Sequence, residues 1–394
     1  MPDKTLDSNC AICDETITAE NDSREHVISE AIGGRLKVKG FICKRCNNAA
    51  GRTWDAKLAA QLHPLSLMFG VNRQRGSTPG LPITTTAGEE LMLRPEGGFG
   101  PVKPSFAEEK TPEGITIQIT ARSMEEARQM LAGVKRKYPN TDIDRILADA
   151  QISTAYPQGM VHHRLEFGGE VSGRSIVKSV LAIAHRAGVP TDTCGDALNY
   201  LRDSAAAPCF GYYHATDLLY NRPAEVPLHC VGVEANPDTG LILGYAEYFG
   251  VQRIVVCLGR NYSGDRAQAC YAIDPRTGKE LDLSVRLGFT EAEIEAIYDY
   301  KMAPYGAIHE AFANVMPAAM KRQFEAEMDR VTGDATEYAL ANCGAKPGEM
   351  LTEEHLKRLS GLMMEKLTPF LLHNLVRQNR APATWAEQIQ TGDA

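Results

Sequence analysis

Four cysteines near the start of the chain have the spacing of a zinc site. Cys10 and Cys13 form one C-x2-C pair, and Cys43 and Cys46 form a second. Each such pair turns tightly enough to direct two thiolates at one ion, and two pairs separated by tens of residues complete a tetrahedral set of ligands. The spacing therefore predicts a structural zinc ion bound by these four cysteines.

Three polar residues accompany the cysteine pairs. Glu25 and His26 stand side by side between the two pairs, and Asn47 directly follows the last cysteine. The stretches EHVISEAIGG and FICKRCNNAAG, together with the pairs, resemble the four-cysteine branch of the HNH endonucleases. The resemblance covers about the first 60 residues. The chain departs from the usual pattern in having Ser29 in place of a proline and in lacking an asparagine before the third cysteine.

The resemblance implies a ββα-metal unit in which His26 is the general base. It also implies that Glu25 is the first metal-binding acid and that Asn47 closes the metal site. A neutral imidazole can take a proton from water near neutral pH, and oxygen ligands suit Mg²⁺ or Mn²⁺. Such a cation would neutralise charge that develops on a phosphodiester during its hydrolysis. In the alternative interpretation, His26 is a hydrogen-bonding residue of a zinc module that performs no chemistry.

The elements that must position these residues can be predicted from local patterns. Residues 24–46 read as a short hairpin with a turn at Gly33 and Gly34, followed by a helix from Asn47. Within that helix Asn47 lies about 20° from Trp54, so it should face the hairpin and His26. Asp55 falls on a different side and is predicted to be a supporting or solvent residue. The apolar stripe of the helix comprises Ala50, Trp54, Leu58 and Leu62.

Charge favours a nucleic-acid surface locally but not for the whole chain. The net charge is −8, so overall charge should not attract DNA. Between residues 24 and 57, however, eight basic residues oppose three acidic ones. Such a patch could bind phosphates without sequence preference, although a solvated hairpin also keeps its basic residues outside. The predicted contacts are Lys44 and Arg45 first, then Arg35, Lys37, Lys39 and Arg52.

The length predicts more than a minimal nuclease. With 394 residues and 43% hydrophobic content, the chain can form at least two cores. We expect an α+β protein with an HNH module at 1–65 and a larger region at 83–394. The larger region should contain an antiparallel meander at about 226–286 and helices at about 290–378. The finer helical segments are predicted at 124–138, 171–188, 290–300, 304–331, 333–342 and 352–378.

Two functions from different classes follow. The first is a metal-dependent DNA endonuclease whose C-terminal region targets, senses, oligomerises or binds a protein partner. The resemblance of the N-terminal module to HNH endonucleases implies such an arrangement, and bacterial defence effectors are built in this way. The second is a zinc-stabilised nucleic-acid-binding or regulatory protein without cleavage activity. No charged and apolar leader and no run of about 18 apolar residues is present, so we expect a cytoplasmic protein without a membrane span.

Overall fold

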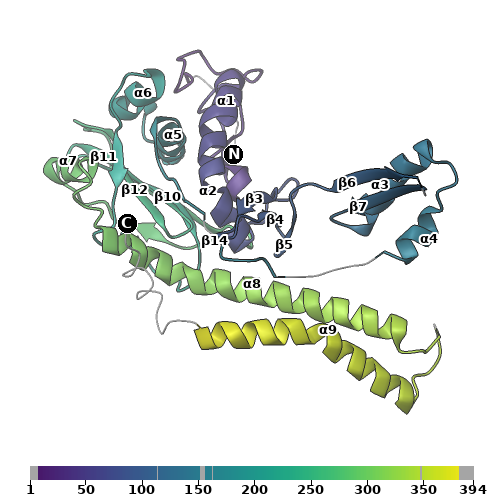
Figure 1. Cartoon of the computed structure of the whole chain (residues 1–394). Helices are drawn as coiled ribbons and strands as arrows, with labels where there is room; N and C mark the ends of the chain where they lie inside the picture. The colour runs from purple at the N-terminus through teal and green to yellow at the C-terminus, as the bar shows by residue number, and fades with distance from the viewer. Residues whose placement is uncertain (1–7, 113, 151–155, 162, 347, 381–394) are drawn as a thin grey trace. The chain divides into compact units, whose positions relative to one another are not determined.

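The structure is a computed structural model that describes residues 8–112, 114–150, 156–161, 163–346 and 348–380. The chain divides into two compact units, one formed by Met1–Gln74 with Phe167–Ala394 and the other by Arg75–Glu166. Helices and antiparallel sheets build both units (Figure 1), which confirms the predicted α+β class. The predicted domains, 1–65 and 83–394, were defined by sequence motifs, whereas these units are defined by contacts between residues. The predicted domains therefore stay a prediction.

A short hairpin begins the first unit. β1 (Glu25–His26) pairs antiparallel with β2 (Lys37–Val38), and the 3₁₀ turn η1 (Glu30–Ile32) lies between them. Gly33 ends this turn with φ at 94°, a value that glycine adopts without strain. A side chain at Gly33 would also meet Pro275, so this hairpin is packed closely against a distant segment.

A long helical segment follows the hairpin. α1 (Lys44–Ala50) begins three residues before the predicted start, continues through the π-helical turn η2 (Gly51–Asp55) and then through α2 (Ala56–Phe69). The predicted stripe is recognisable, because Ala50, Leu58 and Leu62 are buried and Trp54 is half-buried. The two strands and this helix complete the expected ββα arrangement.

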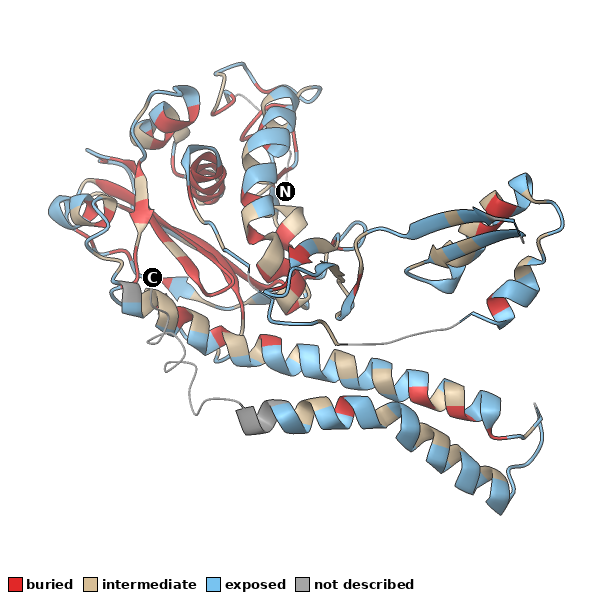
Figure 2. Cartoon of the chain, in the orientation of Figure 1, coloured by how far each residue is buried: buried red, intermediate tan, exposed pale blue. Residues whose placement is uncertain are grey.

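A six-stranded antiparallel sheet and one buried helix form the centre of the first unit. The helix, α5 (Glu170–Arg186), agrees with the predicted segment 171–188, and every residue from Ser172 to Ala184 is buried (Figure 2). It packs on the sheet and on α2, and is flanked by η3 (Thr191–Thr193) and α6 (Gly195–Arg202). The sheet order is β14-β13-β10-β11-β12-β8. Its strands are β8 (Phe210–Tyr212), β10 (His229–Asn236), β11 (Leu241–Tyr248), β12 (Gln252–Gly259), β13 (Ala267–Asp274) and β14 (Lys279–Leu281).

The predicted meander at 226–286 is correct for its first three strands and wrong for the next one. β10, β11 and β12 are consecutive neighbours, but β13 crosses over and pairs with β10. The other edge of β12 is already paired with β8, which lies earlier in the sequence, so β13 takes the free edge of β10. A separate two-stranded ladder joins β9 (Leu219–Tyr220) to β15 (Ser284–Val285).

Helices form the last described part of the chain, as predicted. They are α7 (Glu291–Tyr298), α8 (Tyr305–Asn342) and α9 (Glu353–Arg380). The predicted break near residue 332 is wrong, because α8 continues through Gly333; one glycine costs a helix only about 1 kcal/mol, and α9 packs along α8. Among the described residues, no helix has the length and apolar character needed to cross a membrane.

In its described residues, the second unit holds two small antiparallel sheets and two helices. β3 (Leu81–Thr84), β4 (Glu90–Leu93) and β5 (Phe99–Pro101) form one sheet, and β6 (Ser105–Thr111) pairs with β7 (Gly114–Thr120). The helices are α3 (Met124–Lys137) and α4 (Ile143–Ala148). The Ser123 hydroxyl accepts from the Glu126 N–H at 3.1 Å, which confirms the predicted start of α3.

Backbone groups of the N-terminal hairpin are hydrogen-bonded by the central sheet and by α5. The Tyr271 hydroxyl accepts from the N–H groups of Arg35 and Leu36 at 3.3 and 3.2 Å. The His185 ring lies 3.2 Å from the Lys39 carbonyl. The hairpin is therefore built into the first unit.

A buried histidine makes a further connection and predicts acid sensitivity. His229 Nε2 donates to the Ile32 carbonyl at 2.8 Å, and its Nδ1 accepts from the Phe249 N–H at 3.1 Å, so both ring nitrogens are used in the neutral form. Burial lowers the pKa of His229 to about 4. The unfolded state, with a histidine pKa of about 6.5, binds a proton first, so stability falls as pH decreases from about 6.5 toward 4.

We expect His229 to account for up to about 3 kcal/mol of this loss in unfolding free energy. Urea unfolding at several pH values measures the slope for the wild type and for His229→Gln. His26 and His214, whose pKa values are also lowered to about 4, contribute with the same sign in both proteins. The variant should therefore show a shallower slope, and an unchanged slope would contradict the assignment.

Candidate functional site

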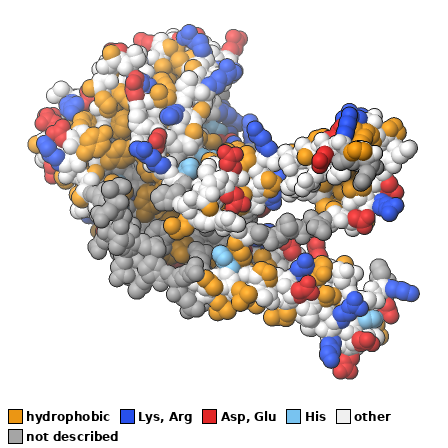
Figure 3. Space-filling view, in the orientation of Figure 1, with side chains coloured by type: hydrophobic (Ala, Val, Ile, Leu, Met, Phe, Trp, Pro, Cys, Tyr) orange, Lys and Arg blue, Asp and Glu red, His pale blue; other side chains and the backbone are white. Residues whose placement is uncertain are grey.

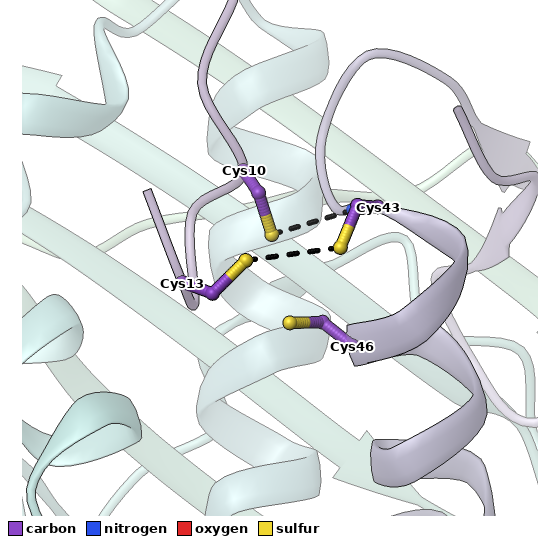
Figure 4. Close-up of side chains that lie close together, drawn as sticks. All are labelled: Cys10, Cys13, Cys43 and Cys46. Carbon is purple, nitrogen blue, oxygen red and sulfur yellow. Dashed lines mark hydrogen bonds between the residues drawn. The ribbon is translucent and has the colours of Figure 1, made fainter. Parts of the chain in front are cut away.

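Four cysteine sulfur atoms gather beside the first turn of α1. The Sγ atoms of Cys10, Cys13, Cys43 and Cys46 all lie within 4.8 Å of one another (Figure 4). Those of Cys13 and Cys43 are 3.7 Å apart, which agrees with two thiolates each at about 2.3 Å from one tetrahedral zinc ion. The cluster fits the structural zinc that the spacing predicts.

Local backbone structure shapes this cluster. Cys43 directly precedes α1, and its N–H donates to the Sγ of Cys10 at 3.3 Å. Cys43 also forms a β-bridge with Asp22, which connects the second cysteine pair to the loop before β1. Within the described ranges, this is the one group of three or more His, Cys, Asp or Glu side chains close enough to hold a metal ion.

His26 lies in β1 and is half-buried. Its Nε2 is buried and has no hydrogen-bond partner in the part of the chain that the structure describes. Burial lowers the pKa of this imidazole to about 4, and the positive charges of Lys37 and Lys178 act in the same direction. His26 is therefore neutral near neutral pH and has a free ring nitrogen, which is the state that a general base requires.

Glu25 is buried beside His26, and α5 supplies its ionic partner. The Lys178 ammonium is ion-paired with the Glu25 carboxylate and, at 2.8 Å, with Oδ2 of Asp55. The side chains of Glu25 and Lys178 are only 4% and 1% exposed. Burial raises the pKa of Glu25 against the opposing effect of Lys178. Burial would lower the pKa of Lys178, but Asp55 and Glu25 outweigh it, so that pKa is raised and the ammonium stays charged.

Asp55 completes this buried cluster. Lys178 bonds one of its oxygens, and the Ser175 hydroxyl donates to the other at 2.5 Å. Asp55 is the last residue of η2, and a π-turn takes more residues per turn than an α-turn, so Asp55 is rotated from the position that a uniform α-helix gives it. The sequence predicted that Asp55 is either a supporting residue of the site or a solvent-exposed one. The structure shows it as a supporting residue.

Asn47 lies in α1 directly after the cysteine cluster and is half-buried. Its side chain makes no hydrogen bond to any residue that the structure describes, so its amide oxygen is available to a ligand. The predicted orientation of Asn47 toward His26 stays a prediction.

The six predicted phosphate contacts lie in different environments. Lys37, Lys39, Lys44, Arg45 and Arg52 are exposed. Lys44 donates to the Glu20 carbonyl at 2.5 Å, and Arg45 lies 3.5 Å from Glu15. Arg35 differs, because it is half-buried, its guanidinium lies close against Gly278 and its Nε is buried. Five of the six are therefore accessible to a ligand.

Comparison with known proteins finds a family match in the N-terminal part of the chain. Residues 10–63 match the family described as HNH endonuclease, which agrees with the resemblance seen in the sequence. This range holds the four cysteines together with Glu25, His26, Asn47 and Asp55. No curated protein and no solved structure matches the chain. At the level of the family, the match supports a nuclease-type enzyme, and the four cysteines of the same range lie close enough to hold a structural zinc ion.

Sequence reasoning missed Lys178 and Ser175 as residues of this cluster. A signal for Lys178 was present, because it stands within the mostly apolar run 175–181 of α5. A charged side chain on a helix that is buried on all sides requires an ionic partner. The partner itself was not visible, since 153 residues separate Lys178 from Glu25.

Proposed function

We propose that the protein is a metal-dependent HNH endonuclease that hydrolyses DNA phosphodiester bonds. The observation that carries the proposal is His26, a neutral imidazole whose buried Nε2 has no partner among the described residues. It lies within the range that matches the HNH endonuclease family. In this proposal His26 Nε2 takes the proton from the attacking water.

The donor atoms of Glu25 and Asn47 are of the kinds that suit a hard divalent cation. Glu25 offers a carboxylate, of which Lys178 bonds Oε1, and Asn47 offers an amide oxygen without a hydrogen bond in the described part of the chain. Oxygen donors of these types suit Mg²⁺ or Mn²⁺ better than zinc. When bound, such an ion would stabilise negative charge on the phosphate and the leaving oxygen. We assign Glu25 and Asn47 as its protein ligands.

Exposed basic side chains of the N-terminal module support nucleic-acid binding. Lys44 and Arg45 are exposed on the first turn of α1, and Lys37, Lys39 and Arg52 are exposed nearby in the sequence. Cations so placed bind phosphate oxygens and orient a duplex without reading its bases. We assign these five as phosphate contacts. Arg35 is a weaker candidate because it packs on Gly278.

The remainder of the chain is proposed to control cleavage. Apolar side chains are exposed on α8 and α9, and the space-filling view shows some of them among charged ones (Figure 3). Proteins associate through such groups where they form a large contiguous patch, and we propose that α8 and α9 contact a second copy of the chain or a protein partner in this way. Control of a nuclease module by such a region would suit a cytoplasmic bacterial defence effector. The exposed apolar residues include Phe324, Met328, Leu340, Leu356, Met364 and Leu372.

A second candidate function is a zinc-stabilised nucleic-acid-binding or regulatory protein without cleavage activity. The specific observation that favours it is the ion pair between Glu25 and Lys178, which occupies part of the carboxylate assigned to the divalent cation. Divalent-metal dependence separates the two candidates, because binding alone should survive both chelation and loss of His26.

Plasmid cleavage by the full chain tests the proposal. Wild-type protein should nick or linearise DNA with Mg²⁺ or Mn²⁺ and not with EDTA. His26→Ala should lower the rate by about 100-fold or more, because general-base catalysis contributes that much. His163→Ala, at an exposed histidine of the second unit, is the matched control and should cleave normally. Equal activity in His26→Ala, or activity in EDTA, would refute the mechanism, and inactive wild type that still binds DNA would favour the second candidate.

A further inference from the structure

A buried lysine from outside the family match lies between two acids of the nuclease module. Lys178 belongs to α5, whereas Glu25 and Asp55 belong to β1 and η2, and its ammonium bonds both carboxylates. We propose that Lys178 is a positioning residue that supplies a permanent positive charge beside Glu25 and thereby sets how tightly the site holds its divalent cation. This inference rests on the proposed function, in which Glu25 is a ligand of that cation.

The position of Lys178 makes its charge permanent. Its side chain is 1% exposed, and α5 is buried from Ser172 to Ala184 between the sheet and the helices around it. An ammonium without its carboxylates would be an unpaired charge in the core, so the side chain cannot move away at acceptable cost. Lys178 therefore differs from a surface lysine that exchanges freely with solvent ions.

The three charges of the cluster do not cancel. Glu25 and Asp55 contribute two negative charges, and Lys178 contributes one positive charge, so one negative charge remains. Any cation that Glu25 binds shares this carboxylate with the ammonium and is repelled by it. In a partly buried site with low effective dielectric constant, such repulsion is strong.

Asp55 offsets the ammonium without competing for the metal. Both of its oxygens are used, Oδ2 by Lys178 and Oδ1 by the Ser175 hydroxyl. It is therefore a charge-balancing residue, and its effect on a cation at Glu25 is electrostatic. The positive charge of Lys178 and the negative charge of Asp55 can therefore be removed separately by substitution.

The test measures the affinity of the zinc-loaded full chain for Mn²⁺. Free Mn²⁺ is quantified by its electron paramagnetic resonance signal. Lys178→Met makes the cluster more negative and should tighten binding about tenfold or more, while Asp55→Asn makes it less negative and should weaken binding about tenfold or more. The double variant, Lys178→Met with Asp55→Asn, restores the original net charge and should bind nearly as the wild type does. Ser175→Ala removes a hydrogen bond without changing charge and is the matched control.

The expected order of Mn²⁺ affinities among these variants distinguishes the proposed role of Lys178 from a purely structural one. If Lys178 only held the fold together, Lys178→Met would bind Mn²⁺ with unchanged or lower affinity, and that result overturns the proposal. Lys178→Met leaves two carboxylates facing each other and can fail to fold. In that case the double variant must still bind more tightly than Asp55→Asn, and equal affinities overturn the proposal. Should the double variant also fail to fold, Asp55→Asn must bind more weakly than Ser175→Ala.

Failure of this inference can be told from failure of the proposed function. Mn²⁺ affinities that follow the charge order in a protein that cleaves no DNA would retain the role of Lys178 and refute the nuclease. Cleavage lost in His26→Ala, together with Mn²⁺ affinities that ignore the charge order, would retain the nuclease and refute the role of Lys178.

Discussion

Replacing Cys43 with serine is expected to abolish zinc binding and to unfold the β1–β2 hairpin together with α1. A structural zinc ion contributes about 10–16 kcal/mol of apparent binding energy in small zinc modules, and that energy is coupled to folding. The effect should be large at Cys43, because its thiolate joins the cluster. Its backbone also caps the start of α1, and its N–H donates to the Sγ of Cys10. Loss of this ligand removes the ion and the start of the helix together.

Elemental analysis and circular dichroism measure this result. Wild-type protein should contain one zinc ion per chain, and Cys43→Ser should contain none and lose part of its helical signal. Cys343→Ser is the matched control, because Cys343 is a buried cysteine at the end of α8, far in sequence from the cluster. Absence of zinc from the wild type, with full cleavage activity in Cys43→Ser, would show that the zinc assignment is wrong.

A fragment of residues 1–74 is expected not to fold on its own, even with zinc. In the whole chain, Glu25 is buried against Lys178, the Ile32 carbonyl accepts from His229, and backbone N–H groups of the hairpin are bonded by Tyr271. Without these residues the module would expose its core and leave its polar groups without their native partners. Loss of one member of a buried ion pair alone costs about 3–5 kcal/mol, which is comparable to the whole stability of a small domain.

Nuclear magnetic resonance of the fragment tests this expectation directly. We expect poorly dispersed amide signals even when the four cysteines bind zinc, whereas the full chain should unfold cooperatively at a much higher denaturant concentration. Cobalt substitution provides the control, because its absorption spectrum reports whether the thiolates still bind a metal. A well-dispersed spectrum for 1–74 would show that the module is autonomous and that its contacts with the sheet are not required.

The sequence by itself determined the four-cysteine cluster, because that geometry is local. Two C-x2-C pairs direct their thiolates through the short backbone turns that contain them, and the four sulfur atoms do gather as the spacing predicts. The positions of α3 and α5 also followed from local patterns of caps and apolar residues, as the Ser123 cap shows. The HNH endonuclease match over residues 10–63 likewise depends on a continuous stretch of sequence.

Only the tertiary structure decided what surrounds the predicted site. The pairing of β13 with β10 depended on β8, which occupies the competing edge of the sheet. The place of Asp55 depended on the π-turn η2, which a uniform helical period does not represent. Lys178 forms an ion pair with Glu25, which lies 153 residues away in the sequence. No local sequence pattern identifies the partner of a buried charge. Burial and ion pairing depend on which segments come together in the folded chain, so the electrostatics of this site belong to the whole first unit.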